Sequence, residues 1–406
     1  MKKRVAIISA CDRHNYGDML FPLVLERLLR ASLPEVSLEY YGLVNSDLSR
    51  HGGKPTKSLQ GLAHDPERES NLILLVAGGE VLDATWTDML LNLVSNPVVR
   101  PLYHLGLAVA RRIGVPKATD WLSRSLLGSC RRFPWVISAN DFPSIQHVIY
   151  NAVGGVGLRV FSAEDRQFVA EQLRHASYLS VRDRETERVL GLLGVKADVV
   201  PDSAILVSEV FPLEKLRLQM KEHSWELLNA FPNGYICFQS GRNHVLGYEP
   251  MIADQLAKLS RRLDLGVVLL PLGRAPEHED HVALRRIQRL MPRKTPVALQ
   301  SSANVIDVMS AIAGAKAFAG TSLHGCITAM SYGIPHIGLT HGIAKLKAFL
   351  STWSVPELAE CVSYDTLSDG VTTALQVPSE KLNLRRNELI HMGRENIERV
   401  AAVIGV

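Results

Sequence analysis

The chain has 406 residues, more than one hydrophobic core usually holds, so two domains are expected. Apolar residues make up 47% of it, which excludes a largely disordered protein, and the net charge of +4 implies no general affinity for nucleic acid. Five scattered cysteines without disulfide or metal spacing indicate a reducing compartment, and no apolar run is long enough to cross a bilayer. A cytoplasmic protein is therefore expected.

Short apolar runs alternate with helical patterns in the first half of the chain. Such alternation is typical of a parallel sheet covered by helices on both faces. We therefore predict a Rossmann-like domain over residues 1–206. Its strands are predicted at 4–10, 36–40, 72–77, 135–139, 178–181 and 198–200.

The loop after the first predicted strand contains Asn15, Gly17 and Asp18 and leads into an apolar helix. Gly17 permits a tight turn, Asp18 is a good helix cap, and Asn15 tolerates unusual backbone angles. These residues are also common in ordinary turns. Because α/β sheets bind ligands at the carboxyl ends of their strands, we predict that all three line a cleft.

Two later turns of the first half have similar positions. Gly78 and Gly79 follow the strand at 72–77, where the backbone can approach a ligand closely. Arg182 and Arg184 follow the strand at 178–181 and either bind a carboxylate or phosphate or form local ion pairs at a helix start.

The segment from Arg100 to Arg132 is basic and amphipathic. It contains seven basic residues and one acidic residue, Asp120, interleaved with leucines and Trp121. One interpretation is a surface helix pair whose apolar face packs on the core. The other is a peripheral contact with an anionic membrane surface.

The second half repeats the strand–helix alternation after a charged linker at 207–232 that ends in a Pro-Asn-Gly turn. Strands at 235–239, 266–270, 296–299, 316–319 and 336–339 predict a second Rossmann-like domain over 233–375. Residues 376–406 are predicted to form a helical segment that packs back on the domains. The expected architecture is α/β, with two doubly wound domains facing a cleft.

The stretch from Gly320 to Pro335 is the strongest functional signal. A buried strand ends in Thr321 and Ser322, and a helix of small and apolar residues follows. A helix N-terminus after a small-residue turn is suited to an anion, most often a phosphate. Thr321, Ser322 and Gly325 are therefore predicted to bind the anion, and His324 is a candidate acid or base beside it.

Two cations are candidates for the same anion. Arg242 follows a small-residue turn at the end of the strand at 235–239, and Lys345 follows the strand at 336–339. Either could instead be an ordinary solvated side chain. No convincing metal cluster is present in the sequence.

In order along nearly the whole chain, these motifs resemble the polysaccharide pyruvyl transferase family. The last motif is the most specific. The matching segments are Asn15-Tyr16-Gly17-Asp18, Gly78-Gly79, Val181-Arg182-Asp183 with Leu193-Gly194 and Asp202, and Ser322-Leu323-His324 with Tyr332-Gly333-Ile334-Pro335.

The resemblance implies a GT-B-like fold and transfer of pyruvate from phosphoenolpyruvate, as a ketal, to a sugar of a bacterial cell-surface polysaccharide or its lipid-linked precursor. It implies no cofactor beyond this donor. His324 would be the acid or base at the donor and Arg242 an anion ligand. Many members have arginine where this chain has Ser322, so donor binding would depend on Arg242, the helix N-terminus and Lys345.

Other assignments stay open at this point. Asp18 and Asp202 are both candidate bases for the sugar hydroxyls. A glycosyltransferase using a sugar nucleotide would have the same fold, although the helix after Ser322 lacks the acidic residue that such enzymes commonly use for the ribose. A non-catalytic glycan-binding relative is the third alternative. A lipid-linked acceptor would fit the basic segment and a location at the inner face of the cell membrane.

Overall fold

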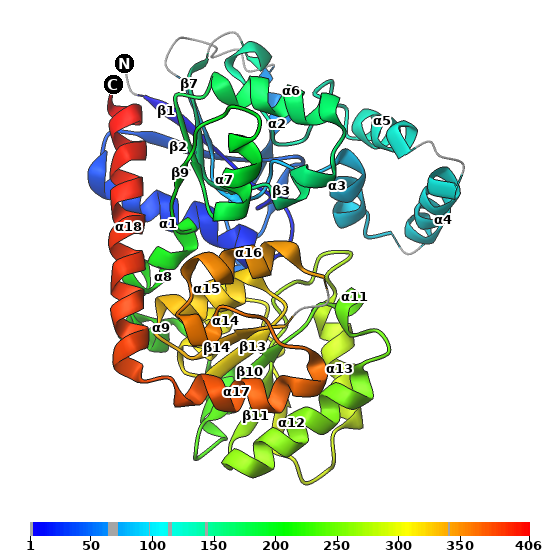
Figure 1. Cartoon of the computed structure of the whole chain (residues 1–406), viewed down its shortest axis with the longest axis vertical. Helices are drawn as coiled ribbons and strands as arrows, with labels where there is room; N and C mark the ends of the chain where they lie inside the picture. The colour runs from blue at the N-terminus through cyan, green and yellow to red at the C-terminus, as the bar shows by residue number, and fades with distance from the viewer. Residues whose placement is uncertain (1–2, 64–71, 97, 113–115, 143–144, 340–341) are drawn as a thin grey trace.

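The computed structural model describes residues 3–63, 72–96, 98–112, 116–142, 145–339 and 342–406. Two sheets lie one above the other, each covered by helices (Figure 1). The first has nine strands in the order β3-β4-β2-β1-β5-β7-β8-β9, with β6 on β7, and the second has the order β12-β11-β10-β13-β14. All pairings are parallel except β3 with β4. The predicted class, α/β with two doubly wound units, is confirmed.

The strand bounds agree closely with the predictions in the second half and less closely in the first. The strands are β1 (Arg4–Ile8), β2 (Ser37–Gly42), β3 (Ser46–Asp47), β4 (Pro55–Ser58), β5 (Leu72–Val76), β6 (Gly79–Glu80), β7 (Ile145–Gly154), β8 (Tyr178–Val181), β9 (Asp198–Val199), β10 (Tyr235–Gln239), β11 (Gly266–Leu269), β12 (Val297–Leu299), β13 (Ala317–Gly320) and β14 (His336–Gly338).

The helices cover both faces of both sheets. Their bounds are α1 (Tyr16–Ser32), α2 (Leu59–Ala63), α3 (Trp86–Leu93), α4 (Val99–Arg112), α5 (Pro116–Leu126), α6 (Ala163–Arg174), α7 (Arg184–Gly191), α8 (Val207–Val210), α9 (Leu213–Gln219), α10 (Glu222–Asn229), α11 (Arg242–Val245), α12 (Glu249–Leu263), α13 (Asp280–Leu290), α14 (Val305–Ala313), α15 (Leu323–Ser331), α16 (Ala344–Trp353), α17 (Leu367–Gln376) and α18 (Ser379–Gly405).

One hydrophobic core extends through both halves of the molecule. Successive side chains of a strand point to opposite faces, so Val5 and Ile7 of β1 face α1, whereas Ala6 and Ile8 face the helices on the other side. The core on the α1 side is continuous with Phe318 of β13 and the residues around it. The two halves are therefore joined by buried apolar surface, which fixes their position relative to each other.

The strand predicted at 135–139 is wrong. Trp135 and Ile137 are buried as expected of a central strand, but the segment has no strand partner. The hydroxyl of Tyr150 instead accepts a hydrogen bond from the N–H of Ile137 at 2.7 Å and donates one to its carbonyl at 2.6 Å. A side chain thus satisfies this backbone, and β7 takes the place in the sheet.

Residues 207–229 are largely helical, and α9 packs against α14 of the second half. After α17 the chain returns through α18, which runs along both halves (Figure 1). This helix packs against α1 and β7, and its Asn396 donates a hydrogen bond to Asn151 of β7 at 2.6 Å. The domain limits at 206, 232 and 375 stay predictions. No helix in the described residues combines the length and apolar character needed to cross a membrane.

Candidate functional site

A cleft of about 450 Å³ lies between the two sheets. The loop after β1 and the loop after β11 meet across it through backbone hydrogen bonds, from Tyr16 N–H to the Leu272 carbonyl at 2.9 Å and from Arg274 N–H to the His14 carbonyl at 3.0 Å. Side chains from both halves line it. They include Arg13, Asn15, Asp18, Glu80, Arg182, His278, Thr321, Ser322, His324 and Lys345.

The turn between β13 and α15 forms as predicted, and its Thr321 and Ser322 line the cleft, whereas Gly325, which was predicted to bind the anion, is not among the lining residues. Ser322 caps α15 by accepting a hydrogen bond from Gly325 N–H at 3.2 Å. The side-chain oxygen of Gln239 accepts the Ser322 N–H at 2.8 Å. Because these two amides are used within the turn, the amides of Leu323 and His324 are the ones left for an anion at this helix end.

His324 lies at the floor of the cleft with only 13% of its side chain exposed. Its ring packs edge-on against Phe21, and a Cβ at Gly17 would overlap its Nδ1, so glycine is required there. Its Nε2 is buried without a hydrogen-bond partner in the protein, 3.7 Å from Asp202 Oδ2. Burial, then the charges of Arg182 and Lys345, lowers the pKa of His324 well below its usual value.

A row of charges behind His324 belongs to the first half. Arg182, 1% exposed, pairs with Glu80 through Nη2 and with Asp202 Oδ2 through Nη1 at 3.3 Å. Asp202 also caps a short helical turn by accepting the Ala204 N–H at 3.0 Å. Burial raises the pKa of Asp202, whereas Arg182 opposes that shift. Both oxygens of Asp202 are therefore engaged, and it is not among the residues that line the cleft.

Asn15 and Asp18 sit at the start of α1 and both line the cleft. Asn15 caps the helix by accepting the Gly17 N–H at 3.1 Å. Burial raises the pKa of Asp18 to about 6, against the opposing charges of Arg13 and Lys345. A carboxyl that titrates near neutral pH is suited to proton transfer.

Gly78, just before β6, and Gly79, its first residue, also line the cleft. Their φ angles are 116° and 89°, in the region that favours glycine, and a Cβ at Gly78 would overlap Phe21. The two glycines thus let the backbone turn so that Glu80 reaches Arg182.

Besides the paired Arg182, two cations line the cleft in the described part of the chain: Lys345, as predicted, and Arg13, which was not predicted. Arg13 is held by Asp12 at 2.8 Å through Nε, and its Nη2 is buried without a partner in the protein. A buried guanidinium group that is left partly unpaired beside a cavity is positioned for an anionic ligand. The sequence signal was available, since Arg13 lies in the same loop as Asn15 and Asp18.

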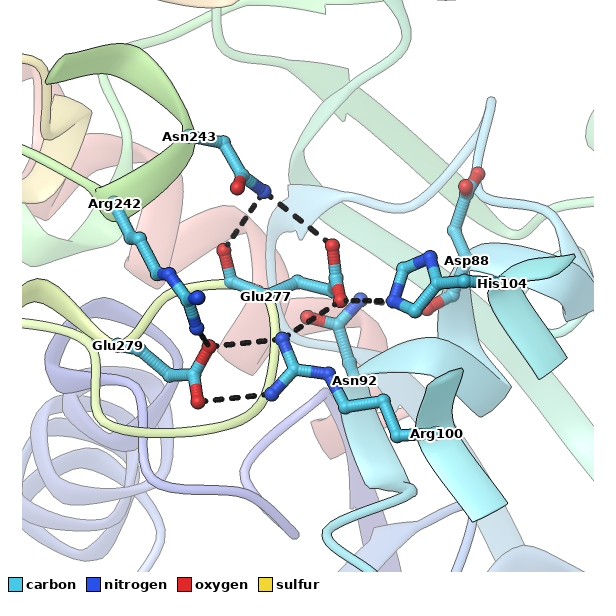
Figure 2. A network of polar contacts seen from close by, with 8 residues as sticks. All are labelled: Asp88, Asn92, Arg100, His104, Arg242, Asn243, Glu277 and Glu279. Carbon is cyan, nitrogen blue, oxygen red and sulfur yellow. Dashed lines mark hydrogen bonds and ion pairs between the residues drawn. The ribbon is translucent and has the colours of Figure 1, made fainter. Parts of the chain in front are cut away.

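Arg242 and Arg184 are not among the residues that line the cleft. Arg184 is exposed at the start of α7. Arg242 binds Glu279 Oε2 at 2.7 Å, so a carboxylate of the protein occupies its guanidinium. Figure 2 shows this contact as part of a wider network.

That network joins α4 of the first half to the loop before α13 of the second. Arg100 donates to both oxygens of Glu279 at 2.8 Å and to Glu277 at 3.0 Å (Figure 2). The hydrogen bonds from Arg100, and then from Arg242, hold the pKa of Glu279 at about 2. Glu277 and Glu279 have φ angles of 68° and 40°, a strained backbone region for residues other than glycine. The loop is therefore kept in place by contacts with the other half.

Replacing Arg100 by leucine is expected to loosen this loop without unfolding the protein. A bidentate pair between partly buried groups is worth about 1–3 kcal/mol, enough to raise local opening several-fold or more. Amide hydrogen exchange should increase in 273–280 and in α4, with no change in β1 or β13. Arg112→Leu, at an exposed position of the same helix, is the control. Equal exchange in both variants would show that Arg100 does not fix the loop.

Among the residues that the structure describes, no three His, Cys, Asp or Glu side chains are grouped so as to hold a metal ion. The chemistry available in the cleft is that of a histidine, a titratable carboxyl group, cations from both halves and a helix N-terminus. This set can bind an anion and move a proton beside it.

Several solved structures, among them UDP-GlcNAc 2-epimerases, have a similar fold. A putative UDP-N-acetylglucosamine 2-epimerase from Listeria monocytogenes gives a TM-score of 0.58 at 12% identity, covering 100% of this chain and 96% of that chain. The S. aureus MnaA–UDP structure gives 0.58 at 14% identity, covering 98% and 94%. UDP-GlcNAc 2-epimerase from Neisseria meningitidis bound to UDP-GlcNAc gives 0.52 at 11%, covering 100% and 99%. Such identities establish the fold, which is GT-B-like, and not the activity.

No curated protein matches this chain significantly. The family model for polysaccharide pyruvyl transferase matches residues 15–342, which span the loop of Asn15, the Arg182 segment and the His324 turn. The chain therefore belongs to the polysaccharide pyruvyl transferase family.

Proposed function

We propose that this chain transfers the enolpyruvyl group of phosphoenolpyruvate to two hydroxyls of a sugar, which leaves pyruvate as a cyclic ketal. The acceptor is a cell-surface polysaccharide or its lipid-linked precursor. The observation that carries the proposal is the buried, unpaired Nε2 of His324 in a cleft with cations from both halves. A donor with a phosphate and a carboxylate matches those cations.

The proposed reaction begins with the donor phosphate near the α15 N-terminus, with Arg13 and Lys345 as its cationic ligands. Ser322 stands where many family members have arginine, so these two residues would supply the charge. C2 of the donor becomes electrophilic when C3 gains a proton. His324 is the proposed source of that proton, which converts the CH₂ group to the methyl group of pyruvate.

A first sugar hydroxyl then attacks C2 and loses its proton, giving a tetrahedral adduct. The C2–O bond to phosphate breaks, phosphate leaves, and a second hydroxyl attacks C2 and loses its proton. One hydroxyl proton restores the histidine and the other leaves with phosphate. Asp18 is the better supported base, because it lines the cleft with a pKa of about 6, whereas Asp202 is engaged by Arg182 and Ala204. Asp202 would instead orient the His324 ring.

This proposal predicts that donor binding takes up a proton. In the empty cleft His324 is neutral at neutral pH, because burial lowers its pKa well below its usual value. A bound dianion raises that pKa, so the affinity for phosphoenolpyruvate should increase as the pH falls from about 8 to about 6.5. Calorimetric titration in buffers of different ionisation enthalpy measures the protons taken up.

His324→Asn is the control for that titration, because the variant should lose the uptake while the ligand's own protonation is unchanged. His278 lines the same cleft, and burial lowers its pKa to about 4; it stays in place in the variant, so any proton uptake that His278 contributes would remain there. A UDP-sugar that binds tightly, with no binding of phosphoenolpyruvate, would reject the donor and favour a glycosyltransferase. Glycan binding without binding of either donor would favour a non-catalytic role.

A further inference from the structure

The projecting helices α4 and α5 carry apolar side chains with no cover from the rest of the protein. They stand away from the body of the first half (Figure 1). The outward side chains of α4 are Leu102, Leu105 and Val109, exposed at 66%, 63% and 51%. In α5, Trp121 and Leu126 are exposed at 60% and 63%. An exposed apolar surface of this kind on a separate element marks an interaction site.

The two helices are nevertheless anchored by their other faces. Leu107 and Ala110 of α4 are buried, and Tyr103 contacts Ser123 of α5. Asp120 accepts hydrogen bonds from the N–H and the hydroxyl of Thr87 in α3 at 3.0 and 3.3 Å. The helices are therefore packed against the protein through one face. The outward apolar residues form a second face, which is exposed although the helices are packed.

The positions of the residues around the axis of α4 also separate the outward side chains from the buried ones. At 3.6 residues per turn, Leu102, Leu105 and Val109 fall within about 60° of one another, roughly opposite Leu107. Arg112 lies about 20° from Leu105 around the axis, beside the apolar stripe. A long basic side chain at the margin of an apolar helix face is the pattern of helices that lie in a lipid interface.

The charge of the segment indicates what covers this face. Residues 100–132 contain seven basic residues and one acidic residue, an excess larger than the net charge of +4 of the whole chain, so the rest of the chain is net acidic. The one acid, Asp120, is bound by Thr87. Of the described basic side chains, Arg100 and Arg132 are in ion pairs and Arg131 packs against the rings of Trp86 and Phe142, whereas Arg112 is exposed and Arg124 is half-buried. Positive charge beside exposed leucines and a tryptophan complements an anionic bilayer.

We propose that α4 and α5 dock the protein on an anionic lipid surface, with the side chains of Leu102, Leu105 and Trp121 entering the headgroup region. Such binding requires no donor or acceptor, so it is independent of the reaction proposed for the cleft. It does place the cleft near a membrane, because Arg100 of α4 contacts the loop of Glu277, which lines the cleft.

Co-sedimentation with vesicles tests the proposal. The full chain should sediment with vesicles of phosphatidylcholine and phosphatidylglycerol, much less with phosphatidylcholine alone, and should be released by added salt. The triple substitution Leu102→Ser, Leu105→Ser and Trp121→Ser should lower the partition at least about tenfold. Arg112→Gln with Arg124→Gln should lower it several-fold, with the effect confined to anionic vesicles.

The matched control is the triple substitution Leu192→Ser, Leu218→Ser and Leu384→Ser, which removes exposed leucines elsewhere on the surface. It should bind vesicles as the unchanged protein does. No sedimentation with anionic vesicles, or equal loss in the two triple variants, would overturn the proposal. A concentration-dependent dimer that only the α4–α5 triple variant loses, without vesicle binding, would assign this face to a second copy of the chain.

Discussion

Replacing His324 by asparagine is expected to abolish ketal formation while the protein stays folded. Loss of a positioned acid–base group costs about 10²–10⁴ in rate, and among the described residues that line the cleft no other combines burial beside the α15 N-terminus with an unpaired ring nitrogen. Asparagine is smaller than histidine and fits under Gly17. The measurement is the transfer of labelled carbon from phosphoenolpyruvate into glycan, with phosphate release followed in parallel.

His281→Asn is a suitable control for this experiment. His281 lies in α13, away from the cleft lining, and burial also lowers its pKa. It should leave turnover unchanged and affect stability as much as the substitution in the cleft. Turnover that survives in the His324 variant would remove histidine from the chemical step and leave the cleft with a binding role.

Replacing Arg182 by methionine is expected to destabilise the fold by about 3–5 kcal/mol. The guanidinium is 1% exposed and pairs with two carboxylates, of which Asp202 is fully buried. Methionine fills much of the same volume but leaves those carboxylates without a cation, and removal of one partner from a buried ion pair has a cost of this size. Denaturant unfolding, followed by probes of secondary and tertiary structure, gives the change.

Arg188→Met provides the comparison for that measurement. Arg188 pairs with Glu185 in the same region, but 59% of its side chain is exposed, so its loss should destabilise the fold far less than the loss of Arg182. If both arginine variants unfold at the same denaturant concentration, the ion pairs of Arg182 with Glu80 and Asp202 do not stabilise the fold. Lower stability together with lost turnover would mean that these ion pairs also keep His324 in its position in the cleft.

The sequence was sufficient to predict those strands whose apolar residues are continuous. Runs such as 235–239 are buried on both faces, so composition alone marks them. The segment at 135–139 has the same composition, and only the hydroxyl of Tyr150 distinguishes it from a strand. This contact between Tyr150 and the backbone of Ile137 cannot be predicted from a pattern of apolar residues. The short strands β3 and β4 consist of polar residues and gave no such signal.

The sequence predicts that a residue lies at the cleft when its motif and its place after a strand both indicate this. It does not predict cases in which the position of a side chain depends on a partner far away in the chain. His324, Ser322 and Asp18 lie at the starts of helices that come after strands, and the carboxyl ends of parallel strands bring them to one cleft. Arg242 also comes just after a strand, yet its guanidinium is taken by Glu279, which Arg100 of the other half holds as well, so its partner depends on how the two halves pack. Arg13, in contrast, is buried, lines the cleft and keeps one guanidinium nitrogen without a partner, none of which a sequence pattern reveals.

The return of α18 to the first half has a consequence for the order in which the protein folds during synthesis. Residues 379–405 leave the ribosome long after β1 and α1, yet Leu389, Ile397 and Val400 complete the core beside them. The amino group of Lys3 donates to the carbonyls of Ile404 and Gly405 at 2.9 and 2.7 Å. The nascent first half must therefore wait with part of its apolar surface uncovered, a period in which a holding chaperone would protect it from aggregation.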